Sequence, residues 1–211
     1  MKIKSINQIS FEISTDTVSL VTDPLAFESF GIKFPKNETD VIAVTQKKYA
    51  NKQNILKGFD KLVGKNRETI YEVNGAGEYE ISQMLIQRPI NSQLYMFDSG
   101  YSRVVYLGLD SKDIDVEAFK DLGDVEVLII PIGAGDDFPS YEKLQDIISE
   151  VEPGTIVPYG YKNGDLNKEN LKTKEEFIHY FGYTNISEEK TLKVAQRELD
   201  QEIPMNIVFL S

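Results

Sequence analysis

Alternating apolar and polar residues in the first half of the chain predict β-strands. Residues 9–13 alternate, and the apolar residues 18–21 follow the dipeptide Asp16-Thr17, so a hairpin is expected there. Residues 41–44 form a short apolar run that is typical of a buried strand. Further strands are expected at residues 69–73, 79–86, 92–97 and 103–107, and the short turns between them predict an antiparallel meander.

Apolar spacing also predicts helices, most of them in the second half, where they alternate with strands. Residues 51–62, 115–122, 141–151 and 173–181 each place apolar side chains on one helical face. Thr173 and Glu176 have the spacing of a capping box at the start of the last helix. Strands are expected at residues 125–132, 155–158, 192–195 and 205–210.

The order of these elements predicts the fold class. A β-rich half followed by alternating strands and helices must bury both faces of its sheets, which indicates a layered α/β sandwich with mixed sheets. The 211 residues suffice for one sizeable core, and no linker pattern divides them. A single domain over residues 1–211 is therefore expected.

Two residue types restrict the chemistry. The chain contains no cysteine and one histidine, His179, which excludes disulfides, thiolate ligands and a His-rich transition-metal site within one chain. His179 lies in the predicted helix 173–181 and is interpreted as a structural or surface residue. A site for Mg²⁺ or Ca²⁺ made of oxygen ligands stays open.

The net charge of −11 opposes binding to nucleic acids. The most basic stretch runs from Lys47 to Arg67 but includes Asp60, and it is interpreted as a solvated helix face, so no nucleic-acid partner is expected. No apolar run approaches the ~20 residues of a membrane span, and the N-terminus lacks the apolar stretch of a signal peptide. A cytoplasmic protein without a membrane partner is therefore expected.

Six short motifs follow one another along nearly the whole chain. They are Thr22-Asp-Pro24, Val41-Ile-Ala-Val-Thr45, Asn74-Gly-Ala-Gly-Glu-Tyr-Glu80, Leu107-Gly108, Leu122-Gly-Asp-Val-Glu-Val-Leu-Ile-Ile-Pro-Ile-Gly133 and Val151-Glu-Pro-Gly-Thr-Ile-Val-Pro158. In this order and spacing the chain resembles the metallo-β-lactamase superfamily, and within it the lactonase-like branch of metal-dependent hydrolases. The resemblance implies a four-layer αββα sandwich with two mixed β-sheets and a metal site at one edge of them.

The resemblance also implies where the first metal ligands would lie, and other residues stand there. The expected Thr-His-x-His-x-Asp-His motif here reads Thr45-Gln-Lys-Lys-Tyr-Ala-Asn51. Gln46, Lys48 and Asn51 take the places of His, and Ala50 takes the place of Asp. An amide is a poor substitute for imidazole, and the Lys48 ammonium has no lone pair near neutral pH.

Two later ligand positions are replaced as well. The metal-bridging Asp would follow Leu107-Gly108, where Leu109 stands. Asp110 comes one residue late and on a strand end should point to the opposite side, although a loop could bring it back. The last His would lie two residues after Pro158, at Gly160. Without a metal, no bound water is activated near neutral pH, so the family's hydroxide nucleophile is lost. No zinc and no other cofactor is expected.

Asp23 matches an aspartate that normally lies beside the metal site in this superfamily. Once the metal is lost, a buried carboxylate needs another positive partner or donor. Lys48 is the candidate, either as an ion pair with Asp23 or in a polar cluster that includes Gln46 and Asn51. The alternative is that Lys48 points into solvent and Asp23 only caps its own turn.

Several residues around the old site could line a ligand pocket. Tyr49 and Asp110 lie beside replaced positions, and Tyr159 and Tyr161 flank Gly160. Strand alternation predicts that the two flanking tyrosines face the same side. Their rings could fill the old cavity or line a pocket, and filling is the commoner outcome.

Two glycine pairs and one acidic pair offer weaker signals. The segments 75–77 and 133–135 each contain two glycines but lack the spacing of known phosphate-binding loops. Asp136 and Asp137 precede the helix predicted at 141–151. N-capping of that helix is the preferred interpretation, and a divalent cation is the alternative.

Three functions stay open. The favoured one is a pseudoenzyme, a non-catalytic member of the fold that has lost its metal site and is retained for binding an unknown small molecule or protein, or as a subunit of a homo-oligomer. The second is a metal-dependent hydrolase with a relocated carboxylate-only site drawn from Asp23, Asp110, Asp136 and Asp137. The third is metal-free acid–base catalysis by Lys48 or a carboxylate in the old cleft. The replaced ligands favour the first, because a fold alone does not establish an activity.

Overall fold

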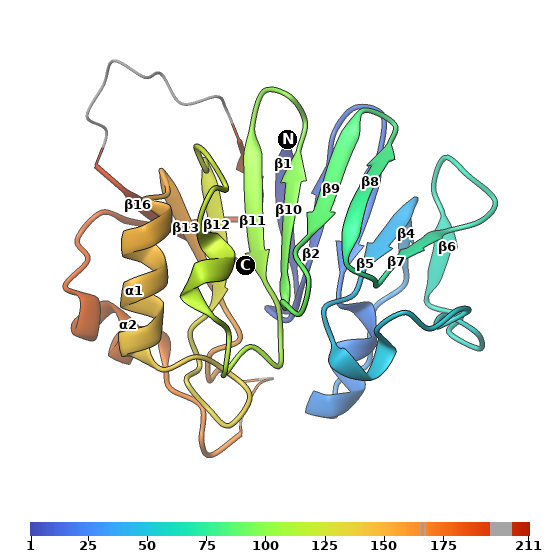
Figure 1. Ribbon diagram of the computed structural model, residues 1–211. Helices are drawn as coiled ribbons and strands as arrows, with labels where there is room; N and C mark the ends of the chain where they lie inside the picture. Colours follow the sequence, from blue (N-terminus) through green and yellow to red (C-terminus); the bar gives the residue numbers. More distant parts are fainter. Residues whose placement is uncertain (165, 167, 195–203) are drawn as a thin grey trace.

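Two β-sheets share a core in the computed structural model, which describes residues 1–164, 166, 168–194 and 204–211 (Figure 1). The first sheet has the strand order β15-β1-β2-β3-β5-β7 and the second the order β14-β16-β13-β12-β11-β10-β9-β8, and β4 pairs with β6 beside them. The strands of the first sheet are β1 Lys2–Ile6, β2 Ser10–Ser14, β3 Ser19–Thr22, β5 Val41–Ala43, β7 Tyr71–Val73 and β15 Leu192–Lys193. Those of the second are β8 Gly77–Ile81, β9 Met84–Arg88, β10 Leu94–Asp98, β11 Arg103–Leu107, β12 Val127–Pro131, β13 Thr155–Tyr159, β14 Ile186–Glu189 and β16 Asn206–Leu210, and the short pair is β4 Asn37–Thr39 with β6 Leu62–Gly64.

Both sheets are mixed, as the sequence predicts. In the first sheet β1, β2 and β3 run antiparallel, which confirms the hairpin at Asp16-Thr17, and β3, β5 and β7 run parallel. In the second sheet β8 to β11 form an antiparallel meander, which confirms the expected one. From β11 through β12 and β13 to β16 the strands are parallel.

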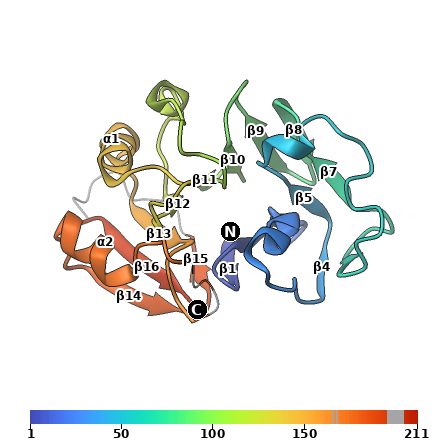
Figure 2. The ribbon, with the colours of Figure 1, turned by 90° about the horizontal axis from the view of Figure 1, so that it is seen from below.

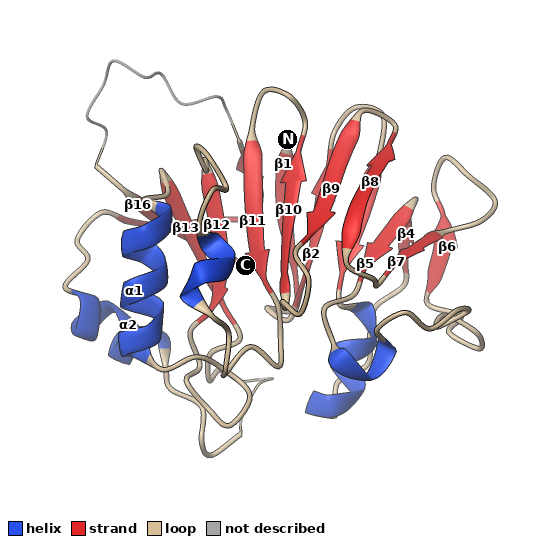
Figure 3. Cartoon of the chain, in the orientation of Figure 1, coloured by secondary structure: helices blue, strands red, loops and turns tan. Residues whose placement is uncertain are grey.

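Two hydrophobic cores hold the layers together. The first lies between the sheets and contains Phe11 from β2 and Ile86 from β9. The second lies on the other face of the second sheet and joins Leu128 of β12 to Leu144 and Phe177 of the two α-helices. Both described α-helices therefore cover one sheet, as Figures 2 and 3 show. No helix in the described part of the chain has the length and hydrophobicity that crossing a bilayer requires.

Two of the predicted helices are confirmed. Helix α1 spans Tyr141–Val151, and α2 spans Lys174–Phe181. The capping box of α2 is present, since Thr173 Oγ1 accepts from the Glu176 backbone N–H and the Glu176 carboxylate accepts from the Thr173 backbone N–H. The remaining helical segments are 3₁₀ helices, namely η1 Pro24–Phe30, η2 Lys47–Tyr49 and η3 Val116–Phe119, the last of which stands where a helix over 115–122 is predicted.

The predicted helix over residues 51–62 is wrong, and its backbone angles give the reason. Asn51, Asn54 and Gly58 have φ values of +56°, +55° and +83°, which a right-handed helix cannot contain. The apolar residues of the segment still pack against the first core. Two of its backbone N–H groups, those of Ile55 and Leu56, donate to the carboxylate of Glu72 at 3.0 and 3.1 Å, so a strand side chain replaces helical hydrogen bonds.

Strand boundaries differ from the sequence prediction in two places. The expected strand 79–86 is a hairpin, because Ser82 and Gln83 adopt φ values of +49° and +67° and turn β8 into β9. The expected strand 192–195 is confirmed only as β15, and residue 195 lies outside the described residues. Strands β1, β4, β6 and β14 are not predicted from the pattern.

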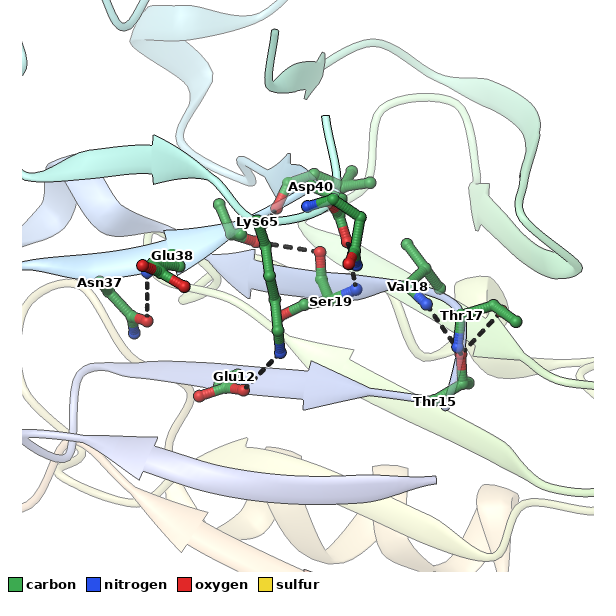
Figure 4. A network of polar contacts seen from close by, with 12 residues as sticks. Glu12, Thr15, Thr17, Val18, Ser19, Asn37, Glu38, Asp40 and Lys65 are labelled. Carbon is green, nitrogen blue, oxygen red and sulfur yellow. Dashed lines mark hydrogen bonds and ion pairs between the residues drawn. The ribbon is translucent and has the colours of Figure 1, made fainter. Parts of the chain in front are cut away.

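The Asp40 side chain connects the first residue of β3, Ser19, to the loop after β6 (Figure 4). Its carboxylate accepts hydrogen bonds from the Ser19 backbone N–H at 3.0 Å and from the backbone and side-chain nitrogens of Asn66 at 2.7 and 2.9 Å. Burial opposes the ionised form, but these hydrogen bonds and the charge of Arg67 outweigh it, so the pKa of Asp40 lies below its ordinary value. Nearby, the ammonium nitrogen of Lys65 lies 3.9 Å from a carboxylate oxygen of Glu12 on β2.

Replacing Asp40 with Asn is expected to lower the free energy of unfolding by about 1–3 kcal/mol near neutral pH, because an amide cannot accept all three hydrogen bonds. The stabilisation by ionised Asp40 is complete above the unfolded-state pKa of about 3.9 and is lost as the pH falls through the lower folded-state pKa. Urea denaturation at several pH values should therefore show the difference between the two proteins shrinking in acid. Asp60→Asn, at a side chain that is 83% exposed, is the control. A difference that stays constant in acid would contradict this assignment.

Candidate functional site

Asp23 lies at the centre of a buried polar cluster that also contains Thr45, Arg88 and Tyr106. It follows β3 with a φ of +40° and is fully buried. Its Oδ1 accepts from the Thr45 backbone N–H at 2.7 Å, and its Oδ2 accepts from Thr45 Oγ1 at 2.5 Å and from the Tyr106 hydroxyl at 2.8 Å. Its side chain makes no cap hydrogen bond to η1, so the turn-capping alternative is wrong. Both carboxylate oxygens are therefore bound by donors of the protein itself.

A buried guanidinium, that of Arg88, lies on the other side of Thr45. Arg88 ends β9 and donates to the carbonyl oxygens of Val44 at 2.9 Å, Thr45 at 3.0 Å and Asn74 at 2.9 Å, and it also donates to the Ser92 carbonyl. It thereby joins the segments that follow β5 and β7, and the Val44 carbonyl also accepts from the Tyr95 hydroxyl at 3.2 Å. Thr45 connects the two charges, because its N–H binds Asp23 while its carbonyl binds Arg88.

The electrostatics of the cluster follow from its burial. Burial raises the pKa of Asp23, while the hydrogen bonds from Thr45 and Tyr106 and the charge of Arg88 act in the opposite direction. Burial and the nearby Asp23 carboxylate raise the pKa of Tyr106 well above its ordinary value, and burial does the same for Tyr159. Both phenols therefore stay protonated and act as donors, Tyr106 to Asp23 and Tyr159 to the Leu107 carbonyl at 2.8 Å.

The structure does not form the predicted Asp23–Lys48 ion pair. Lys48 is exposed, and its ammonium lies 4.9 Å from the centre of the Tyr49 ring. Within the described part of the chain, no hydrogen bond or ion pair joins Lys48, Gln46 or Asn51 to Asp23, whose partners are Thr45 and Tyr106. The prediction is wrong because Thr45 and Tyr106 already bind the carboxylate, and because the buried charge of Arg88 compensates it from inside the fold.

The remaining positions of the first motif are spread between core and surface. Gln46 is buried, and its Oε1 has no hydrogen-bond partner among the described residues. Ala50 and Asn51 are exposed, and the Asn51 side chain lies against Gly75. Tyr49 is half-buried, packs against the first core and accepts at its carbonyl from the Asn74 side chain at 3.0 Å.

Gly160 marks the end of strand alternation rather than a point within it. Its φ of +67° turns the chain, so Tyr159 packs in the first core while Tyr161 packs in the second. The expectation that both tyrosines face one side is therefore wrong. A Cβ atom on Gly160 would lie 3.3 Å from the ring of Phe138, a buried residue of the first core. This ring covers the position where a side chain at residue 160 would begin.

The segment after β11 is closed by packing. A Cβ atom on Gly108 would lie 2.1 Å from Thr45 Oγ1 and 2.5 Å from Thr45 Cβ, so only glycine fits beside the side chain that binds Asp23. Leu109 is buried in the first core. Asp110 is half-buried with a φ of +61°, near enough to Tyr159 for its charge to contribute to raising the pKa of that phenol.

The donor set at these positions does not fit the metal that the fold resemblance implies. Both oxygens of the Asp23 carboxylate already accept hydrogen bonds from the protein. The Leu109 side chain is a hydrocarbon, and Gly160 has no side chain and is covered by the Phe138 ring. Throughout residues 1–164, 166, 168–194 and 204–211, no three His, Cys, Asp or Glu side chains are grouped closely enough to hold an ion. What the arrangement does instead is hold a buried carboxylate and a buried guanidinium in fixed positions.

The other predicted candidates lie outside this cluster. His179 is exposed in the last turn of α2. Asp136 and Asp137 are exposed, and neither caps α1, because Ser140 is its N-cap; that preferred interpretation is wrong. Asp136 accepts instead from the Asn170 side chain at 3.2 Å.

Sequence reasoning misses Arg88 and Tyr106, for different reasons. Met84, Ile86 and Arg88 alternate in β9 and all point inward, so period-two spacing continued past the predicted end of that strand would have placed Arg88 in the interior. Tyr106 lies in a run of apolar residues that is buried on both faces, and nothing in that run signals that its hydroxyl binds Asp23.

Comparison with known proteins identifies the family of this chain. The sequence profile of the family described as the beta-lactamase superfamily domain matches residues 2–160. No curated protein matches the sequence.

Solved structures share the fold. A protein from Thermotoga maritima, assigned to the Zn-dependent hydrolases of the metallo-beta-lactamase superfamily, superposes with a TM-score of 0.74 at 18% identity, over 100% of this chain and 98% of its own. An isothiocyanate hydrolase from Delia radicum gut bacteria has a TM-score of 0.60 at 12% identity, over 92% and 100% of the two chains. A protein from Parabacteroides distasonis, assigned to the metal-dependent hydrolases, has 0.54 at 16%, over 99% and 93%. At these identities the likeness establishes the fold.

Replacing Gly108 with Ala is expected to lower the free energy of unfolding by about 1–3 kcal/mol or more, because the new methyl group overlaps the Thr45 side chain that binds Asp23. Gly164→Ala is the matched control, since a Cβ atom there meets nothing within 4 Å. Chemical denaturation of both variants measures the difference. Equal stability of the two variants would show that Thr45 can move aside without cost.

Replacing Arg88 with Met is expected to lower the free energy of unfolding by about 3–5 kcal/mol, because it leaves Asp23 buried without a compensating charge and removes the guanidinium donors of the Thr45 and Ser92 carbonyls. Asp23→Asn should cost less in the Arg88→Met background than in the wild type, because the uncharged amide no longer needs the guanidinium. A double-mutant cycle measured by urea denaturation gives this coupling. Additive effects would mean that the two charges do not interact.

Proposed function

This chain belongs to the beta-lactamase superfamily, and we propose that it is a member that works without a metal ion and without catalysis, retained to bind a small molecule or another protein. Membership of the family does not fix the function, because similar folds carry many unrelated functions. Its main support is the Asp23 cluster. A carboxylate from the edge where the superfamily resemblance implies a metal is bound entirely by Thr45 and Tyr106.

A hydrolase of this superfamily would need a metal to activate water near neutral pH. The chain offers no substitute at the corresponding positions. The Tyr106 and Tyr159 hydroxyls are buried donors whose pKa values are raised well above the ordinary range, so neither is suited to act as a base. The Lys48 ammonium is exposed beside Tyr49, away from a buried acceptor. These features argue against metal-free acid–base catalysis in the old cleft.

The alternative is a hydrolase with a relocated carboxylate-only site. Its candidate ligands have different surroundings, since Asp23 is enclosed by donors while Asp136 and Asp137 are exposed in the loop before α1. A divalent ion prefers several oxygen ligands that converge on one point. No group of this kind is found among the described residues. The experiment below distinguishes a relocated carboxylate-only site from the metal-free proposal.

Protein purified without an affinity tag and dialysed against Zn²⁺, Mn²⁺ or Mg²⁺ is expected to retain far less than one ion per chain when measured by mass spectrometry. Unfolding temperatures with and without each ion should agree, because an ion that binds only the folded state would raise them. The dialysis buffer without protein is the control for free metal. A stoichiometric ion that is lost in Asp136→Asn or Asp137→Asn would establish the carboxylate-only site and overturn the proposal.

A further inference from the structure

A groove of about 440 Å³ opens where the loop before α1 meets the loop after β11 and the segment before α2. Three lysines line it, namely Lys112 after β11, Lys143 in the first turn of α1 and Lys172 before α2. The chain as a whole carries 34 acidic and 23 basic residues. Three lysines against Asp113 and Glu142 in one concave surface therefore reverse the overall charge balance.

The three ammonium groups differ in how far their positions are fixed. Lys172 lies 5.2 Å from the centre of the Tyr141 ring and 3.5 Å from Glu176, so its side chain is held at the groove. Lys112 and Lys143 form no ion pair with any residue that the structure describes. Lys112 and Lys143, which have no ion pair, and Lys172, whose position is fixed, thus line the same groove.

One buried hydroxyl group at this groove has unmet hydrogen-bonding capacity. The Tyr141 hydroxyl is one of only four buried side-chain polar atoms in the described part of the chain that lack a partner. Tyr141 lines the groove and is 5% exposed. Buried polar groups almost always find a partner, so an unpaired hydroxyl beside a lysine-lined groove indicates a missing ligand or its ordered water.

One acidic side chain competes for the same space. The Glu142 carboxylate interacts with its own backbone N–H and with the Ser140 hydroxyl, and these contacts lower the pKa of Glu142. It therefore already occupies the positive N-terminal end of α1. The lysines and the Tyr141 hydroxyl, rather than the helix end, must supply the binding energy for another anion.

We propose that this groove binds the phosphate group of a small molecule. A phosphate dianion has enough oxygens to accept from three ammonium groups and the Tyr141 hydroxyl at once, and lysine is a common phosphate ligand that acts as a point charge. The inference deepens the ligand-binding role proposed above and rests on it. It also places the ligand away from Asp23, on the helical side of the second sheet.

The neighbouring surface offers room for the organic part of such a ligand. A second groove of about 340 Å³ shares Gly135 and Phe138 with the first and adds Phe30 and Leu171. Asp136, Asp137 and Glu169 also line this second groove and outnumber its one lysine, Lys168, so it repels a second anionic group and suits an uncharged part. A phosphomonoester should therefore bind more tightly than inorganic phosphate.

Titration of the full chain with inorganic phosphate and with phenyl phosphate, followed by NMR at low ionic strength, tests the site. Saturable shifts are expected at residues 111–113 and 140–143, with tighter binding of phenyl phosphate and weaker binding as salt is added. Lys143→Gln and Lys172→Gln should each weaken binding by about tenfold, whereas Glu142→Gln should strengthen it by roughly threefold. Tyr141→Phe, which keeps the ring, should also weaken it.

Lys120→Gln is the matched control, because Lys120 is exposed, pairs with Glu117 at 2.7 Å and does not line the groove. Circular dichroism of every variant excludes misfolding as the cause of a loss. Absence of saturable binding, or equal affinity of Lys143→Gln, Lys172→Gln and Lys120→Gln, would overturn the inference. The metal content of the same preparation keeps the two proposals apart: without a bound ion, failure of phosphate binding removes only this site and leaves the metal-free assignment intact.

Discussion

A carboxylate buried between two sheets must be satisfied from within, and the contacts of Asp23 show how this chain does it. Thr45 gives it two donors and Tyr106 a third, while Arg88 binds the far side of Thr45 and supplies the opposite charge. These residues come from four segments, the end of β3, the end of β5, β9 and β11. The register of both sheets at this edge therefore depends on a single polar cluster, and an unpaired member would carry a large penalty.

The same cluster shows how a buried carboxylate can be compensated by groups of the chain itself. Here a guanidinium compensates it through the backbone of Thr45, without direct contact between the two charges. Arginine suits this role because its planar donors can bind several carbonyls at once.

Much of the fold is readable from the sequence, and the site is readable only in part. The meander, the hairpin at Asp16-Thr17, both α-helices and the family follow from local periodicity, caps and motif order. The segment 51–62 is not predictable in this way, because its apolar spacing suits a helix while Asn51, Asn54 and Gly58 adopt left-handed angles that tertiary contacts such as those of Glu72 select. The residue types that stand at the ligand positions implied by the resemblance can be read from the sequence. The compensating charge of Asp23 cannot, because Arg88 lies 65 positions away and comes near it only once the sheets close.

Phe138 has a consequence for any redesign of this edge. A histidine introduced at residue 160 would have to displace the ring that packs there, so it would cost stability. A polar residue at 109 would meet the same resistance from the core around Leu109. Each single substitution toward a metal centre would therefore destabilise the fold on its own, so such a centre could be built here only by several changes made together.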